Sequence, residues 1–147
     1  LGETMRVDTQ ARAETDRWDN GCAISLGLAL DADSSRLFIG CTTKAVALDA
    51  DSGEVQGTLD VAAGVDIIAF NAELQHLYLN GSATGQLSIA RVASDGALEL
   101  LATETTAQST GSSCVASDPH ANIWVCDANA GKLFDNVRRS MTGVPVP

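Results

Sequence analysis

An internal repeat of about 40 residues limits the folds open to this chain more than any other feature of the sequence. Residues 29–32 and 37–39 (ALDA, LFI) align with residues 69–72 and 77–79 (AFNA, LYL), and residues 115–118 and 123–125 (VASD, IWV) form a third copy. Each copy is a short apolar run, a polar turn and a second run rich in aromatic and β-branched residues. This pattern is typical of two antiparallel strands joined by a tight turn.

The second half of each unit repeats as well. Residues 45–48 lead through a corner that contains Asp and Gly (49–53) to residues 54–59, and residues 87–90 lead through a similar corner (93–96) to residues 98–101. Glycine suits such corners because it adopts positive φ without strain. Residues 5–9 match residues 46–50, which places Trp18 at the position of Leu59. The sequence therefore predicts two strands, two units of four strands, and a third unit of at least three.

Four short strands every 40 to 46 residues is the period of a β-propeller blade. We therefore predict an all-β fold made of propeller blades, each a sheet of four antiparallel strands. The predicted organisation is a blade array over residues 1–139, with a half-blade at 5–20 and blades at 23–63, 64–107 and 108–139. Residues 140–147, which contain two prolines, are expected to form a tail or a truncated strand.

The stretch from Trp18 to Phe70 resembles the YVTN/YncE-like β-propeller repeat family. The resemblance rests on GLALD (27–31), RLFIGC (36–41), LDADSGEV (48–55) and GVDIIAF (64–70). Members of that family form closed rings of about seven blades, and such proteins are roughly twice as long as this chain. The resemblance thus implies an incomplete ring here: a fragment, an open wedge, or half of a seven-bladed ring that two copies complete as a homodimer.

Charge excludes two classes of partner. The chain has 9 Lys and Arg against 19 Asp and Glu, a formal net charge of −10. Binding to a nucleic-acid backbone or to an anionic membrane surface needs clustered cations, so we expect neither nucleic acid nor membrane as a partner. No apolar run approaches the roughly 18 residues of a membrane span.

Three polar residues are candidates for a ligand site on the propeller axis. Asp66 lies on the first strand of its blade, which lines the axial channel of a propeller, and Asn80 and Asp127 follow second strands. Lactonase-type and gluconolactonase-like propellers bind Ca²⁺ through side chains of this kind, and Ca²⁺ takes six to eight oxygen ligands. Turn-forming Asn and Asp are expected at such positions in any case, so the alternative is a purely structural role.

The four cysteines allow two disulfides, and reduced, buried thiols are the alternative that the sequence favours. If Ala116 pairs with Ile123, Cys114 and Cys126 lie nearly opposite each other on adjacent strands. Cys22 and Cys41 lie at the same end of the first hairpin of their blade. Without a Cys-x-x-Cys pair, a structural zinc site is not expected.

The function predicted from the sequence is non-enzymatic: a binding or scaffolding propeller that contacts a protein or small-molecule ligand through its loops. The alternative is a calcium-dependent hydrolase of the lactonase type. No catalytic residue and no cofactor other than Ca²⁺ is predicted. The family resemblance implies an extracytoplasmic location, periplasmic or secreted.

Overall fold

Thirteen strands form four antiparallel sheets in the computed structural model, which describes residues 2–106, 111, 114–120, 122–127 and 132–135. The first sheet is a hairpin of β1 (Glu3–Asp8) and β2 (Ala13–Asp19). Blade one contains β3 (Ser25–Asp31), β4 (Arg36–Cys41), β5 (Lys44–Asp49) and β6 (Val55–Asp60). Blade two contains β7 (Val65–Asn71), β8 (His76–Gly81), β9 (Gln86–Val92) and β10 (Leu98–Thr105). Blade three contains β11 (Val115–Ser117), β12 (Ile123–Asp127) and β13 (Lys132–Asp135).

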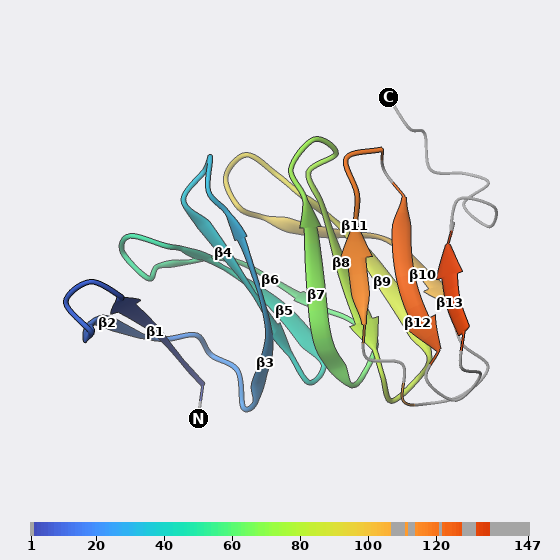
Figure 1. Cartoon of the computed structure of the whole chain (residues 1–147), viewed down its shortest axis with the longest axis horizontal. Coiled ribbons are helices and arrows are strands. Elements are labelled where there is room, and N and C mark those ends of the chain that lie inside the picture. Colours follow the sequence, from blue (N-terminus) through green and yellow to red (C-terminus); the bar gives the residue numbers. More distant parts are fainter. Residues whose placement is uncertain (1, 107–110, 112–113, 121, 128–131, 136–147) are drawn as a thin grey trace.

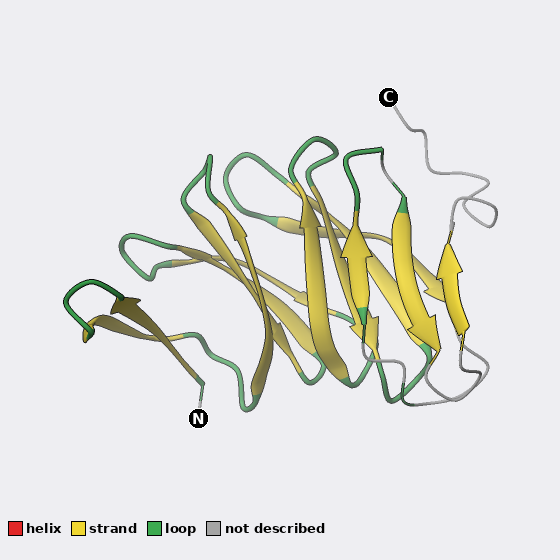
Figure 2. Cartoon of the chain, viewed as in Figure 1, coloured by secondary structure: helices red, strands yellow, loops and turns green. Residues whose placement is uncertain are grey.

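Each sheet is a simple up-and-down meander, so every strand pairs with its neighbour in the sequence. The described residues contain no helix (Figure 2), and hence none long and apolar enough to cross a membrane. The predicted tail, residues 140–147, lies outside the described residues.

Side-chain oxygens of Asp and Asn close the turns between strands. Asp49 Oδ1 accepts hydrogen bonds from the backbone N–H groups of Asp51 and Ser52, at 3.0 and 2.7 Å. These bonds hold the pKa of Asp49 below its usual range, with the Ser52 backbone contact as the largest cause. Such self-bonding turns are local, which explains why the sequence reveals them so clearly.

Among the described residues, three apolar cores are associated with the blades, and two of them lie between neighbouring blades. Residues of blades one and two together form the largest core, in which Phe38 and Leu77 are fully buried. The rings of Phe38 and Phe70 lie 4.7 Å apart across this interface. A second core joins blades two and three around Tyr78 and Val125. Burial of this apolar surface between sheets stabilises the stack.

The first strands of the blades lie next to one another. Figure 1 shows β3, β7 and β11 running side by side, with the β1–β2 hairpin at one end of the stack and blade three at the other. This arrangement places the connections after the second and fourth strands at one end of the blades. We call this end the loop end, and the opposite one the turn end.

Candidate functional site

Backbone hydrogen bonds tie the connections at the loop end into a continuous belt. The N–H of Gly64 donates to the carbonyl of Thr42 at 2.7 Å, and the N–H of Ser82 donates to the carbonyl of Gly64 at 2.9 Å. The N–H of Gly111 then donates to the carbonyl of Ser82 at 2.7 Å. The belt thus crosses from blade one through blade two to the segment that leads into blade three. Its loops are held in fixed positions relative to one another.

Small, uncharged side chains cover much of this belt. Thr42, Thr43, Ala83 and Thr84 are exposed, whereas Ser82 is half-buried. The hydroxyl of Ser82 also donates to the Gly64 carbonyl at 2.8 Å, which fixes its position. The loop end therefore presents short side chains on rigid backbone.

Two of the three predicted ligand residues lie together at this end. Asp66 sits at an irregularity of β7, between the pairs Val65–Gly81 and Ile68–Leu79. Asn80 on β8 lies between the partners in those two pairs, so Asp66 and Asn80 occupy neighbouring strands at the same level. The side chain of the third residue, Asp127, lies outside the described part of the structure.

Asn80 holds two blades together. Its side chain is fully buried, and its Nδ2 donates to the backbone carbonyl of Cys114 at 3.4 Å. Asn20 makes a similar connection between the N-terminal hairpin and blade one, because its Nδ2 donates to Thr4 Oγ1 at 2.9 Å and to Ser25 Oγ at 3.0 Å. A buried amide that bridges two sheets in this way stabilises their docking. Asn20 was not predicted from the sequence as a site residue, although it directly follows the strand that ends at Asp19.

The described residues contain no cluster of acidic side chains that would support the calcium hypothesis. Among them, no group of three or more His, Cys, Asp and Glu side chains is placed to hold a metal ion. Asp66 and Asn80 would supply at most three oxygen atoms, whereas Ca²⁺ needs six to eight ligands.

The cysteines lie in the pairs that the sequence suggested, and the structure joins both pairs. Cys22 and Cys41 form a disulfide with 5.6 Å between their Cα atoms, and Cys114 and Cys126 form another with 5.4 Å. The register Val115–Val125 places Cys114 and Cys126 directly opposite each other. The structure thus differs from the reduced state that the sequence favoured, because each pair lies within bonding reach across neighbouring backbone segments.

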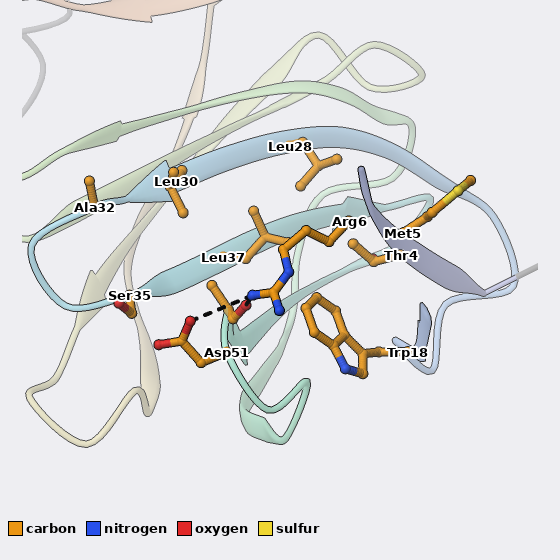
Figure 3. A pocket seen from close by; sticks show the side chains of 11 residues that line it. Thr4, Met5, Arg6, Trp18, Leu28, Leu30, Ala32, Ser35, Leu37 and Asp51 are labelled. Atoms are coloured by element: carbon orange, nitrogen blue, oxygen red, sulfur yellow. Dashed lines mark hydrogen bonds and ion pairs between the residues drawn. The ribbon is translucent and has the colours of Figure 1, made fainter. Parts of the chain in front are cut away.

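An apolar groove, which the sequence did not indicate, separates the β1–β2 hairpin from blade one (Figure 3). Its volume is about 420 Å³. Leu28 and Leu30 of β3 and Leu37 of β4 line one wall, and Met5 and Trp18 line the other. Its only charged lining residues among those described are Arg6 and Asp51.

The Arg6 guanidinium reaches across the groove. It lies 5.4 Å from the centre of the Trp18 ring, donates to the carbonyl of Ala50 at 3.2 Å and lies 3.6 Å from the Asp51 carboxylate. A cation stacked on an aromatic face is attracted by the electrons of the ring. These contacts hold the hairpin against blade one, while the apolar floor of the groove stays open.

Titratable groups at the turn end have structural partners. Asn122 donates to Asp118 from its side chain at 2.8 Å and from its backbone at 2.9 Å, and these contacts lower the pKa of Asp118 to about 2. Burial, with the nearby Arg91 as a second cause, lowers the pKa of His76. Burial raises the pKa of Tyr78 to about 12.

Comparison with known proteins identifies the fold. No protein-family model matches the chain, and no curated protein matches its sequence. Among solved structures, a chain of the Mitotic Checkpoint Complex matches 87% of this chain with a TM-score of 0.74 and 15% identity. The β-propeller domain of Swd1 from Myceliophteria thermophila matches 91% with a TM-score of 0.70 and 16% identity, and BamB from Moraxella catarrhalis matches 84% with a TM-score of 0.63 and 13% identity.

The chain is therefore an all-β protein built from β-propeller blades, as the repeat predicted. It spans 40%, 47% and 37% of the three matched chains, respectively, so its blades make up an incomplete ring. At these identities the likeness establishes the fold and not the activity.

Proposed function

We propose that this chain is a non-enzymatic binding module that contacts a protein partner through the loop end of its blades. Within the propeller fold, we assign it to the YVTN/YncE-like type on the motifs described above. The observation that carries the proposal is the backbone belt from Thr42 through Gly64 and Ser82 to Gly111. Because the belt fixes the loops before a partner arrives, little conformational entropy is lost on binding.

The side chains on the belt also favour recognition over chemistry. Thr43, Ala83 and Thr84 are exposed and lack the acid–base groups that hydrolysis needs. The two disulfides agree with an extracytoplasmic location, since disulfides persist in oxidising compartments. Completion of a ring by two copies is an alternative arrangement, which the mass in solution tests.

A binding experiment tests the loop end directly. Thr43→Arg and Ala83→Arg, combined in one variant, place two bulky charges on the belt. The matched control, Ala72→Arg with Ala97→Arg, places the same charges on exposed positions at the turn end of blade two that do not line the groove. We expect partners captured by the wild-type chain to be lost from the loop-end variant and kept by the control. Equal capture by all three proteins would contradict a role for the loop end.

The alternative is a calcium-dependent lactonase-like hydrolase, and the neighbouring positions of Asp66 and Asn80 are the observation that favours it. Thermal unfolding with and without millimolar Ca²⁺ separates the two functions. A bound ion stabilises the folded chain by linkage. We expect an unchanged Tm and no hydrolysis of lactones. A rise in Tm that Asp66→Ala abolishes, together with calcium-dependent lactone hydrolysis, would replace the binding module with the hydrolase.

A further inference from the structure

A row of leucines on β3 faces away from blade two and is exposed to solvent. Leu26, Leu28 and Leu30 alternate along the strand and are 53%, 59% and 59% exposed, and Ile24 just before it is 49% exposed. Single exposed apolar side chains are normal on protein surfaces. A contiguous row beside an apolar groove instead marks an interaction site.

In blade two, the residues that correspond to these leucines pack against the preceding blade. Leu28 and Leu30 correspond to Ile68 and Phe70 of β7. Ile68 is only 5% exposed and belongs to the core that contains Phe38 of β4, and Phe70 packs against that core. The cover consists of β3 and β4, the first two strands of the preceding blade. Their small residues, Gly27 and Gly40, let β7 approach so closely that a Cβ on either would lie within 3 Å of blade two.

The N-terminal hairpin supplies the other half of such a blade. Glu3 pairs with Asp19 in the hairpin as Lys44 pairs with Asp60 in blade one. Asp8 accepts two backbone hydrogen bonds in the turn that follows, just as Asp49 does. The strands β1 and β2 therefore correspond to β5 and β6, the third and fourth strands of a blade.

The edge of β1 that faces the groove is open. Its counterpart β5 pairs with β4 along this edge, whereas β1 pairs with β2 alone among the described strands. On the face of the hairpin that is turned away from blade one, Met5 and Val7 are 48% and 52% exposed, whereas their counterparts Val46 and Leu48 are 1% and 0% exposed. Both the strand edge and the leucine row thus lack the same two strands.

We propose that this face binds a two-stranded antiparallel β-ribbon with the pattern of β3 and β4. One strand of the ribbon, rich in small residues, lies over Leu28 and Leu30. The other pairs with the open edge of β1 through backbone hydrogen bonds, which is strand addition. The bound ribbon completes the N-terminal sheet to four strands and continues the series of blade-to-blade interfaces already present on either side of blade two.

Strand order favours such a ribbon over a second copy of the chain. The described strands of blade three occupy the first, second and third positions of a blade, and the hairpin occupies the third and fourth. Joining the two would place two strands in the third position. The occupant is instead a ribbon that offers a first and a second strand only.

The experiment uses the chain's own β3–β4 sequence as the ribbon. Residues 23–43, with Cys41→Ser, are fused ahead of Gly2 through a flexible linker that contains a protease site. A tether raises the effective concentration, so a weakly stable hairpin can still be tested. We expect the fusion to raise the Tm by roughly 5 °C or more. After cleavage of the linker, the ribbon should co-elute with the chain in size-exclusion chromatography.

The matched control carries Leu28→Asp and Leu30→Asp in the parent part of the fusion. Both side chains are more than half exposed, so this double variant without the ribbon should keep the circular dichroism spectrum and the Tm of the parent. With the ribbon it should gain no stability. An equal gain in both fusions, or a gain in neither, overturns the proposal. A parent chain that is a dimer in light scattering, and becomes a monomer on Leu28→Asp and Leu30→Asp, overturns it in favour of a second copy.

Discussion

The guanidinium of Arg36, at the start of β4 in blade one, donates a hydrogen bond to the backbone carbonyl of Ser94 in blade two at 3.1 Å. The same group donates to the carbonyl of Ala93 at 3.4 Å and to Gln56 Oε1 at 2.6 Å. Arg36 is only 5% exposed. A buried cation therefore joins the turn between β9 and β10 to the blade before it, and the planar fork of arginine suits several acceptors at once.

Removing this guanidinium should loosen the contact between blades one and two. Arg36→Met keeps most of the apolar stem but leaves the carbonyls of Ala93 and Ser94 and the amide of Gln56 without their donor. We expect a loss of about 2–3 kcal/mol in the free energy of unfolding, measured with urea. The matched control is Arg91→Met, because Arg91 is exposed and lies 3.6 Å from Glu99 in a surface pair. It should cost no more than about 0.5 kcal/mol. Equal losses in the two variants would show that the buried hydrogen bonds of Arg36 contribute no more to stability than a surface ion pair does.

Two turns of the repeat place a side chain in the left-handed backbone region. Gln75 has φ of +53° and Ser35, its counterpart 40 residues earlier, has φ of +50°. Their carbonyls accept equivalent hydrogen bonds, from Val92 at 2.8 Å and from Ala50 at 2.7 Å. Glycine adopts this region without the steric cost that other residues meet.

Gln75→Gly should therefore raise the free energy of unfolding, by about 0.5–1 kcal/mol after the entropy of the unfolded chain is counted. Ala72→Gly, in the same turn but at a position without positive φ, is the control and should lower stability. Urea unfolding of both variants beside the wild type measures the difference. A loss of stability in Gln75→Gly would mean that the amide bond from Gln75 Nε2 to the Ala72 carbonyl, at 2.7 Å, outweighs the relief of strain.

Much of the fold was predictable because its signals are local. Asp49 and Asp118 close turns within four residues of themselves, and alternating apolar residues mark the strands on either side. The groove was not predictable in this way. The leucines of β3 have the pattern of a buried strand, and their exposure depends on which strands lie across from them. The role of Arg36 was hidden for the same reason, since its carbonyl partners lie 57 and 58 residues away.

The candidate site was predictable in part. Strand alternation and blade position placed Asp66 and Asn80 at one end of blade two, and the structure places them on neighbouring strands there. The partner of the Asn80 amide, the Cys114 carbonyl, lies in the next blade. The two residues are 34 positions apart in the sequence and meet only because the blades pack together, so the sequence allowed a structural role for Asn80 but did not indicate this partner.

The two disulfides determine how many thiols the unfolded protein exposes to a thiol reagent. Protein unfolded without reductant should show no reactive thiols, and reduced protein should show four, one for each cysteine. Cross-links that close loops restrict the unfolded chain, and each of these typically adds about 2–4 kcal/mol to stability. Cys22→Ser with Cys41→Ser, and Cys114→Ser with Cys126→Ser, should each lower the Tm. Four reactive thiols in the unreduced protein would show instead that the chain exists in the reduced state that the sequence favoured.

The carboxylate of Asp118 should make stability depend on acid. Hydrogen bonds from Asn122, and further ones from the backbone of His120 and the indole of Trp124, lower its pKa from 3.8 to about 2 in the folded chain. The unfolded chain therefore binds the proton more tightly than the folded chain does. The contribution of Asp118 to stability is complete above about pH 4 and is lost as the pH falls towards 2.

Asp118→Asn tests this dependence because asparagine keeps one acceptor oxygen and removes the titration. Its Tm should lie below that of the wild type at pH 6, and the difference should shrink between pH 4 and pH 2. Asp33→Asn, at an exposed position in the corresponding turn of blade one, is the matched control for the change in net charge. Thermal unfolding followed by circular dichroism across this range provides the measurement. A difference between wild type and Asp118→Asn that stays constant from pH 6 to pH 2 would show that the hydrogen bonds act on the turn without stabilising the ionised carboxylate.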